Sequence, residues 1–236
     1  MKRIIKISLI LLLVGMAVIA AVPFLKEKRA EKKYENDFKK IQESVTEKKS
    51  DVNGLVKKNK DCIGYVEIPG TTISYPVMQT KDKPDFYLNH DFNRNYSFYG
   101  TPYLSAYCDV EKSDNLIIYG HNINGGKMFG ALEQYKDKEF FYKHRKIYFT
   151  TDKKREYEVF AVMCVNIHEF EYWKFVTARD KKEYDEFVDK VEKQSLWRQG
   201  NKPKYGEQML MLSTCDNGKG DDWRIVIVGK IIVQYY

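Results

Sequence analysis

The sequence predicts a mainly β protein built on a small closed β-barrel, with helices before the barrel and one helix in a long connection near the end of the chain. Short segments rich in Val, Ile, Tyr and Phe alternate with turns that contain Gly, Pro, Asn or Asp. Few segments have helical periodicity. Aromatic residues make up 14% of the chain, which suits strands with many half-buried positions. Many short strands of this kind favour closure of the sheet into a barrel.

The first predicted element is an apolar run over residues 7–25, which follows Lys2, Arg3 and Lys6 and contains no charge. At ~1.5 Å per residue, a helix of this length spans about 28 Å, close to the ~30 Å hydrocarbon core of a bilayer. We therefore predict a transmembrane signal-anchor over residues 1–25. A cleaved signal peptide is the alternative, because residues 18–20 offer small side chains to a peptidase.

Residues 26–60 form a predicted helical stem that is rich in Glu and Lys and contains no Pro. Apolar residues recur in it at three- and four-residue steps, as they do on one face of a helix. These residues are Tyr34, Phe38, Ile41 and Val45. A partly ordered spacer fits the same segment equally well.

The net charge of +7 belongs to the N-terminal part of the chain. Residues 1–60 carry 15 Lys and Arg against 7 Asp and Glu, whereas residues 61–236 carry 25 against 26. A nearly neutral folded domain argues against nucleic-acid binding. The basic stem instead suits a position beside an anionic membrane or wall polymer.

The folded domain is predicted over residues 61–236. Its predicted strands, each bounded by turn residues, cover residues 63–68, 73–77, 101–106, 115–119, 146–150, 156–167, 208–215 and 225–233. A short helix is predicted at residues 128–135. A second helix is predicted over residues 180–196, inside a long connection at residues 168–207. Its apolar residues at near-helical spacing are Tyr184, Phe187, Val188, Val191 and Leu196.

Four cysteines are present, Cys62, Cys108, Cys164 and Cys215. No Cys-x-x-Cys pair or Cys/His spacing typical of zinc ligands occurs, so we predict no metal and no cofactor. Cys164 lies in an apolar run and is predicted to be a small core residue. If Cys215 is a nucleophile, three thiols remain and cannot all pair, so we expect no essential disulfide.

Cys215 is the candidate nucleophile because it ends a buried strand and precedes an Asp-Asn-Gly turn. Arg224 stands at the start of the next predicted strand, so the two residues are expected to lie close together. A neighbouring guanidinium favours the thiolate, which is the nucleophilic form of cysteine. The alternative for Arg224 is an exposed ion pair with Asp221 or Asp222, worth about 0–1 kcal/mol.

His121 is the candidate proton carrier, since it follows the predicted strand at residues 115–119 and is flanked by glycines. His90 lies in a compact aromatic segment and is its strongest competitor. His144 lies among Lys and Arg and is predicted to be on the surface. His168 follows a strand and is predicted to lie beside the long connection.

These residues resemble a known family. The Leu-Ser-Thr-Cys sequence ending at Cys215, the Tyr-Gly-His sequence ending at His121, and Arg224 before a Val-rich strand resemble sortases. Sortases are membrane-anchored cysteine transpeptidases of Gram-positive bacteria, and the resemblance covers roughly residues 60–236. Helical sequence before the barrel and a helix in the connection before the Cys strand resemble class B sortases.

The resemblance implies a sortase-type β-barrel outside the cell and a two-step acyl transfer without a cofactor. Cys215 would attack the threonine carbonyl of an Asn-Pro-x-Thr-like sorting signal and form a thioester. His121 would carry the proton, and Arg224 would hold substrate and offset charge on the oxyanion. The implied partners are surface proteins bearing that signal, a peptidoglycan precursor or cross-bridge amine, and the membrane through the N-terminal helix.

Further residues are weaker candidates for substrate binding. Ser213 precedes the Thr-Cys pair, Leu88 belongs to the compact aromatic segment, and Tyr172 and Trp173 in the long connection are candidates for a wall over the groove. Each is also suited to ordinary packing.

Other functions remain open at this point. A catalytically silent, membrane-tethered binding domain and a pilus-assembling sortase both fit the sequence. An L,D-transpeptidase is disfavoured, because those enzymes keep Ser-His-Gly-Cys together whereas here His121 lies far before Cys215.

Overall fold

The computed structural model describes residues 6, 15–26, 28–29, 32–33, 35–36, 39 and 52–235. The chain forms two units, Met1–Lys49 and Ser50–Tyr236. In the first unit, residues 15–26 are helical. No helix among the described residues is both long and apolar enough to span a bilayer. Part of the predicted anchor and all four residues of the predicted stem face lie outside the described residues.

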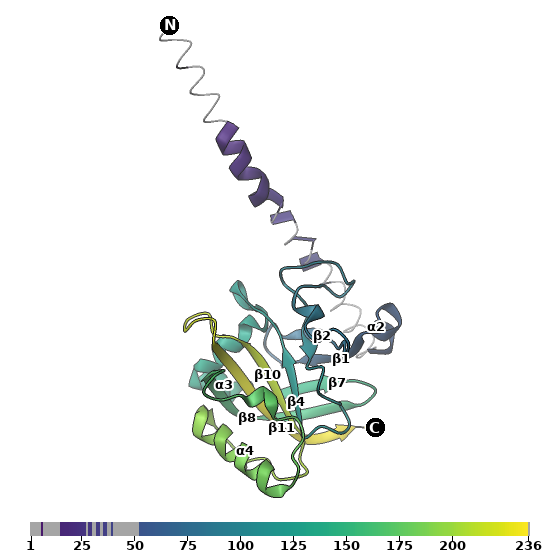
Figure 1. Ribbon diagram of the computed structural model, residues 1–236, viewed down its shortest axis with the longest axis vertical. Coiled ribbons are helices and arrows are strands. Elements are labelled where there is room, and N and C mark those ends of the chain that lie inside the picture. Colours follow the sequence, from purple (N-terminus) through teal and green to yellow (C-terminus); the bar gives the residue numbers. More distant parts are fainter. Residues whose placement is uncertain are drawn as a thin grey trace. The chain divides into compact units, whose positions relative to one another are not determined.

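Eight strands of the second unit close into a β-barrel, which confirms the predicted fold class (Figure 1). Neighbours pair around the barrel, and pairing of β8 with β11 completes the closure. In barrel order the strands are β11 (Trp223–Tyr235), β10 (Met209–Cys215), β4 (Asn115–Tyr119), β3 (Tyr103–Leu104), β2 (Ser74–Met78), β1 (Cys62–Glu67), β7 (Lys146–Thr150) and β8 (Lys154–Asn166).

Two of the barrel pairings are parallel, β4 with β10 and β2 with β3. In the first, Met209 lies opposite Asn115 and Ser213 opposite Tyr119, so both strands end at the same edge of the sheet. β11 is antiparallel to β10 and therefore begins at that edge. This arrangement brings the end of β4 to the same edge as β10 and β11, which follow much later in the sequence.

The predicted strands are confirmed, with differences in length and number. β4 has the predicted limits, whereas β3 contains only two residues of the predicted segment 101–106. One strand that the sequence pattern does not predict is β9 (Ser195–Arg198), which extends the sheet beside β8. The pattern also does not predict the small hairpin of β5 (Asn122–Ile123) and β6 (Lys127–Met128).

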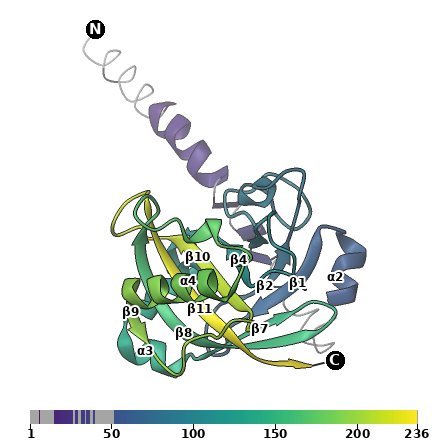
Figure 2. The same ribbon diagram turned by 60° about the horizontal axis from the view of Figure 1, so that its bottom comes forward.

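The helix predicted in the long connection is present as α4 (Lys181–Gln194). The Asp180 side chain accepts a hydrogen bond from Glu183 N and caps its start. Figure 2 shows α4 on the outside of the barrel, with β9 after it. The prediction that Leu196 belongs to this helix is wrong. The helix ends before Leu196, which lies in β9 and is 44% exposed. A 3-10 turn, η4 (Tyr172–Lys174), precedes α4.

The remaining helical elements are short. α2 (Val52–Lys58) packs against β1, η1 (Phe86–Leu88) lies in the compact aromatic segment, and η2 (Asn124–Gly126) links β5 to β6. The helix predicted at residues 128–135 is confirmed as η3 (Phe129–Lys136), of 3-10 type.

The last short helix, α3 (Lys138–Lys143), corrects the prediction that His144 is a surface residue. His144 caps the C-terminus of this helix and stacks on Phe140 with ring centroids 3.9 Å apart. It is therefore buried, in spite of its basic neighbours.

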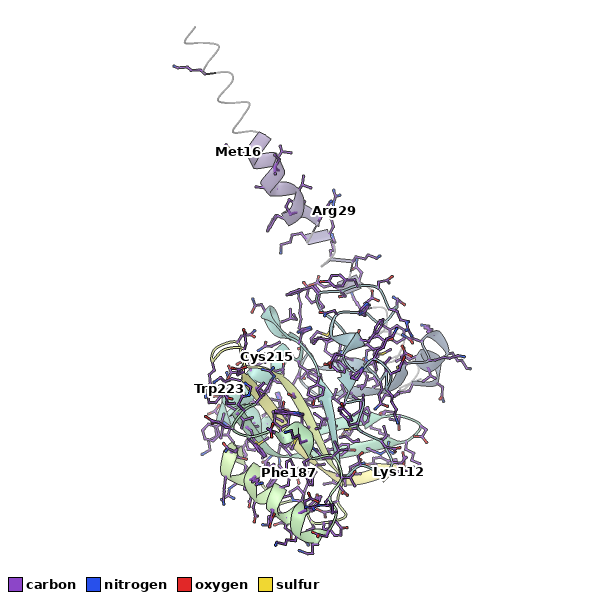
Figure 3. All side chains as sticks on the ribbon, in the orientation of Figure 1. Met16, Arg29, Lys112, Phe187, Cys215 and Trp223 are labelled. Atoms are coloured by element: carbon purple, nitrogen blue, oxygen red, sulfur yellow. The ribbon has the colours of Figure 1, made fainter. Side chains whose placement is uncertain are left out.

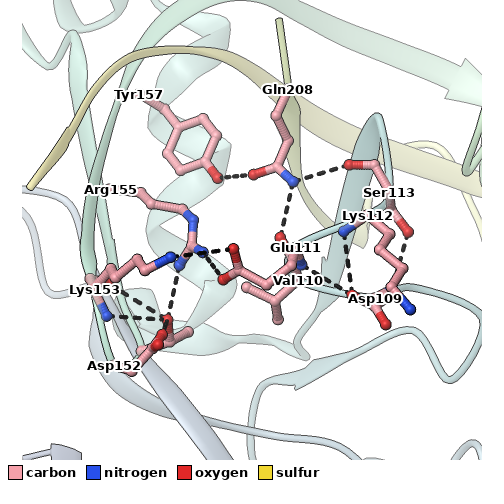
Figure 4. Close-up of polar contacts among 11 residues, drawn as sticks. Asp109, Val110, Glu111, Lys112, Ser113, Asp152, Lys153, Arg155, Tyr157 and Gln208 are labelled. Atoms are coloured by element: carbon pink, nitrogen blue, oxygen red, sulfur yellow. Dashed lines mark hydrogen bonds and ion pairs between the residues drawn. The ribbon is translucent and has the colours of Figure 1, made fainter. Parts of the chain in front are cut away.

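A buried arginine joins the β7–β8 hairpin to the loop before β4 (Figure 4). The Arg155 side chain is 1% exposed and forms an ion pair with Glu111, and its Nη1 donates to Thr151 Oγ1 at 2.7 Å. Beside it, Tyr157 donates to Gln208 Oε1 at 2.7 Å, and Gln208 Nε2 donates to carbonyl oxygens of the same loop. A charge this deeply buried requires its partner, so the loop is held at a fixed position.

Replacement of Glu111 by alanine tests this ion pair. We expect the free energy of unfolding in urea to fall by about 2 kcal/mol, because the buried Arg155 charge loses its partner; half-exposure of Glu111 keeps the loss below that of a fully buried pair. The control is Asp189→Ala, which removes an exposed pair with Lys202 and should cost about 0–1 kcal/mol. Equal losses in the two variants would contradict the prediction.

Candidate active site

The three residues predicted to form the site meet at one rim of the barrel. Cys215 is the last residue of β10, and Arg224, near the start of β11, is its direct cross-strand partner. His121 follows β4. Tyr119 and Ser213 are partners in the parallel ladder, and His121 and Cys215 each follow their own partner residue at the same spacing along the chain. Figure 3 shows Cys215 and Trp223 together at one end of the β10–β11 pair and Lys112 at the other.

Backbone contacts hold the segment before His121 against β10. Gly120 N donates to Ser213 O at 3.1 Å, and Thr214 Oγ1 donates to Gly120 O at 2.7 Å. A Cβ atom at Gly120 would lie 2.7 Å from the Phe129 ring, so only glycine allows this approach. Phe129 N in turn donates to His121 O at 2.9 Å. The backbone at His121 is thereby tied to the strand that carries Cys215.

The imidazole of His121 is oriented by a backbone carbonyl. Its Nε2 lies 2.8 Å from Leu88 O. A carbonyl oxygen can only accept, so Nε2 carries a proton and Nδ1 is the nitrogen left to exchange one. The ring also lies parallel to the exposed Phe98 ring, with centroids 6.4 Å apart and planes 6° from parallel. The histidine therefore has a defined tautomer and a defined orientation.

The guanidinium of Arg224 is held by backbone oxygens of its own loop. Nη1 donates to Asp221 O and, at 2.9 Å, to Trp223 O. Within residues 52–235, its hydrogen bonds go to these carbonyls and not to the carboxylates of Asp221 or Asp222. The alternative of an exposed ion pair between Arg224 and Asp221 or Asp222 is therefore not present in this part of the chain.

Comparison with known proteins agrees with this geometry. A family model described as Sortase domain matches residues 66–232. The chain belongs to the sortase family.

Its relatives place this sortase in class B. Sortase B of Listeria monocytogenes is 32% identical over 191 residues, which cover 80% of this chain and 76% of that protein. Sortase B of Staphylococcus aureus is 28% identical over 241 residues, covering 98% of both chains. The solved Staphylococcus aureus sortase B–substrate complex superimposes with a TM-score of 0.78 at 27% identity, covering 86% of this chain and 97% of that one. The enzyme is therefore a cysteine transpeptidase of class B, as the resemblance implied.

Two of the weaker candidates form a buried hydrogen bond beneath the sortase site. The Tyr172 hydroxyl lies 2.7 Å from Ser213 Oγ, and both side chains are almost fully buried. Burial raises the pKa of Tyr172 to about 12, while Arg224 lowers it and Cys215 raises it, so the phenol lies within electrostatic reach of both. Direct contact of Ser213 or Tyr172 with substrate stays a prediction.

The other two weaker candidates are half-buried. Trp173 packs edge-on against Tyr172, with centroids 5.9 Å apart. Leu88 lies beside the site because its carbonyl contacts His121. A role for either side chain in the substrate groove also stays a prediction.

The competing histidines have other partners. His90 stacks on Phe86, with centroids 3.8 Å apart, and its Nδ1 lies 2.6 Å from Phe86 O. His168 is 72% exposed, and its Nε2 lies 3.5 Å from Asp222 Oδ1. Neither contact involves Cys215 or Arg224.

The sequence analysis did not identify a layer of tyrosines beside the site. Tyr103 and Tyr119 pair across β3 and β4, with ring centroids 5.5 Å apart, and Tyr103 donates to Asp85 Oδ1 at 3.2 Å. Burial raises the pKa of both phenols; Cys215 also raises that of Tyr103, whereas Arg224 lowers that of Tyr119. Their positions at strand ends near His121 were the available signal, but tyrosine is common throughout this chain.

The four thiols are free and have different surroundings. Burial raises the pKa of Cys62 to about 12 and that of Cys108 to about 11. Cys164 is partly exposed, which corrects its prediction as a core residue, and its thiol donates to Oδ2 of the buried Asp216 at 2.8 Å. Burial and the Asp216 carboxylate raise its pKa as well. These three thiols are therefore protonated at neutral pH.

Alkylation with iodoacetamide at pH 7.5 tests the reactivity of the thiols. We expect one modified cysteine per chain, Cys215, because raised pKa values keep the other three as unreactive thiols until the pH rises well above 9. Mass spectrometry of intact protein and of peptides makes the measurement. The Cys215→Ala variant should remain unmodified, and faster labelling of Cys164 than of Cys215 would contradict the prediction.

Proposed function

We propose that this sortase cleaves an Asn-Pro-x-Thr-like C-terminal sorting signal after threonine and joins the surface protein to a peptidoglycan amine. The observation that carries the proposal is the convergence of Cys215, His121 and Arg224 at one barrel rim, through the β4–β10 and β10–β11 pairings. The similarity to the solved Staphylococcus aureus sortase B–substrate complex supports a substrate site on this fold.

In the first step, the Cys215 thiolate attacks the threonine carbonyl carbon, and the carbonyl electron pair moves to oxygen. Collapse of this tetrahedral species breaks the peptide bond and leaves a thioester on Cys215. The departing amine takes a proton from Nδ1 of His121, which has accepted it from the Cys215 thiol as the thiolate formed, since Nε2 is engaged with Leu88 O. Division of one difficult acyl transfer into two easier steps is the benefit of the covalent intermediate.

In the second step, the acceptor amine attacks the thioester and His121 takes its proton. The Cys215 sulfur leaves with its electron pair, so the enzyme regains its starting state and the product contains a new amide bond. Water in place of the amine gives hydrolysis. A peptidoglycan precursor or cross-bridge supplies the amine in this proposal.

Arg224 is the proposed donor to the oxyanion. The backbone N–H that follows Cys215, that of Asp216, donates to Trp223 O at 2.9 Å and is already engaged. The Arg224 guanidinium belongs to the direct cross-strand partner of Cys215 and is steadied by two carbonyl oxygens. Such preorganised donors stabilise a developing charge without reorganisation, and each is worth about 3 kcal/mol.

We further propose that the predicted signal-anchor over residues 1–25 holds the enzyme at the cell membrane in a single pass, with the catalytic domain outside. The apolar run supports the membrane span, and the family to which the chain belongs supports the outward orientation. Surface proteins with a C-terminal sorting signal would meet the enzyme there.

Cleavage of fluorogenic Asn-Pro-x-Thr peptides tests the catalytic assignments. Cys215→Ala should show no turnover, His121→Ala should lose about 10²–10⁴-fold in kcat/KM, and Arg224→Ala about 10²–10³-fold. The matched control for Arg224 is Arg198→Ala, whose guanidinium pairs with Glu192 on the surface and should leave activity unchanged. Hydroxylamine should release the peptide hydroxamate from a thioester in the wild type only.

Two outcomes would overturn the proposal. Equal turnover by the wild type and Cys215→Ala would exclude the thioester. Peptide binding without cleavage, unchanged in Cys215→Ala, would instead indicate a binding domain.

A further inference from the structure

Four polar side chains form a connected network behind the two catalytic strand ends. Asn122 immediately follows His121, and Asp216 immediately follows Cys215. Glu133 and Lys136 lie on η3 and connect these two residues. The network is made of side chains that the mechanism above does not use.

The contacts of the network run from the backbone of Cys215 to the side chain of the next residue. Asn122 Nδ2 donates to Cys215 O at 2.8 Å and to Glu133 Oε1 at 2.7 Å. The other Glu133 oxygen lies 2.7 Å from Lys136 Nζ, which lies 2.7 Å from Asp216 Oδ1. Asn122 therefore contacts the Cys215 carbonyl directly and is linked through Glu133 and Lys136 to the Asp216 carboxylate.

Asp216 is the buried anchor of the network. Its side chain is 0% exposed, and a carboxylate in such a place needs charged and hydrogen-bonding partners. Burial would raise its pKa, but hydrogen bonds from Cys164 and Lys136 more than offset this and hold the pKa below its usual value. Burial alone would lower the pKa of Lys136, which its two carboxylate partners instead raise. Both groups therefore stay charged at neutral pH.

The network contacts the active site only from behind. Successive side chains of an extended segment point to opposite faces, so Asp216 and Thr214 face away from Cys215 and Ser213. The contacts agree with this alternation, since Ser213 meets Tyr172 of the long connection whereas Asp216 meets Lys136 of η3. The network is thus placed to hold the backbone of the nucleophile without contacting its sulfur or a peptide bound there.

We propose that Asn122, Glu133, Lys136 and Asp216 are positioning residues that set the placement of the Cys215 thiol relative to the His121 imidazole. The inference rests on the proposed function for its catalytic consequence. It assigns a purpose to a buried ion pair that would otherwise only stabilise a loop.

Steady-state kinetics of Asn122→Ala and Lys136→Met test the proposal with the sorting peptide that the wild type cleaves. We expect kcat to fall about 10- to 100-fold, because a displacement near 1 Å at the reacting groups costs that much. KM should stay within about threefold, since the network does not face the peptide. The kcat of the double variant should be close to that of the less active single variant, because both substitutions disrupt the same connected network.

Two further variants separate positioning from stability. Lys136→Arg keeps the charge and donors and should restore kcat to within about threefold of the wild type. Lys146→Met is the control, because it removes a comparable ion pair between Lys146, on β7, and the buried Glu156. β7 pairs with β1 and β8 and with neither β4 nor β10. This control substitution should lower the free energy of unfolding while kcat is unchanged. Loss of kcat in Lys146→Met equal to that in Lys136→Met, or no rescue by arginine, would overturn the proposal.

Alkylation of Cys215 by iodoacetamide at pH 7.5 gives a readout that needs no sorting peptide. His121→Ala is expected to change this rate by about threefold or more, because the proposed mechanism places the imidazole beside the thiol. Asn122→Ala should shift the rate in the same direction, and Lys146→Met should leave it unchanged. If no peptide is cleaved by the wild type, the proposed function fails while this comparison still decides the network. A wild-type alkylation rate in Asn122→Ala would overturn the positioning role.

Discussion

The parallel pairing of β4 with β10 is the contact on which the active site depends. Parallel neighbours end at the same edge of a sheet, so His121 and Cys215 leave their strands side by side although 93 residues separate them in the sequence. The antiparallel turn into β11 then returns Arg224 to the same edge. Hydrogen bonds between Gly120, Ser213 and Thr214 continue the pairing beyond the ladder. The proposed reacting groups are therefore placed by backbone geometry, which costs little reorganisation when a substrate arrives.

Around this edge, buried polar groups have partners before any substrate binds. Tyr172 meets Ser213, Tyr103 meets Asp85, and Leu88 O meets His121. A buried polar group without a partner would cost free energy and would compete for the reacting atoms. Burial also keeps the thiols of Cys62 and Cys108 protonated. Which cysteine can react therefore depends on where the fold places each sulfur.

The two ends of the barrel serve different purposes. At the end away from Cys215, Arg155 is almost completely buried and ties the β7–β8 hairpin to the loop that leads into β4. The long β8–β11 pairing closes the barrel and pairs the edges of β8 and β11 that an open sheet would leave free. At the site end, loops and the long connection surround the strand ends. A stable barrel thus carries a candidate site formed by strand ends and the loops around them, a division common to enzymes with rigid scaffolds.

Local patterns in the sequence were sufficient to predict the strands, α4, the barrel class and the order of His121, Cys215 and Arg224, because alternation, helical spacing and turn residues act over a few positions. They did not predict β9, the burial of His144, the partial exposure of Cys164 and its contact with Asp216, or the carbonyl of Leu88 on His121. Those features depend on segments that meet only after folding. The sequence by itself therefore determined which residues have the chemistry of a sortase. The tertiary structure alone decided which atoms meet, because strand register and burial are long-range properties of the closed barrel.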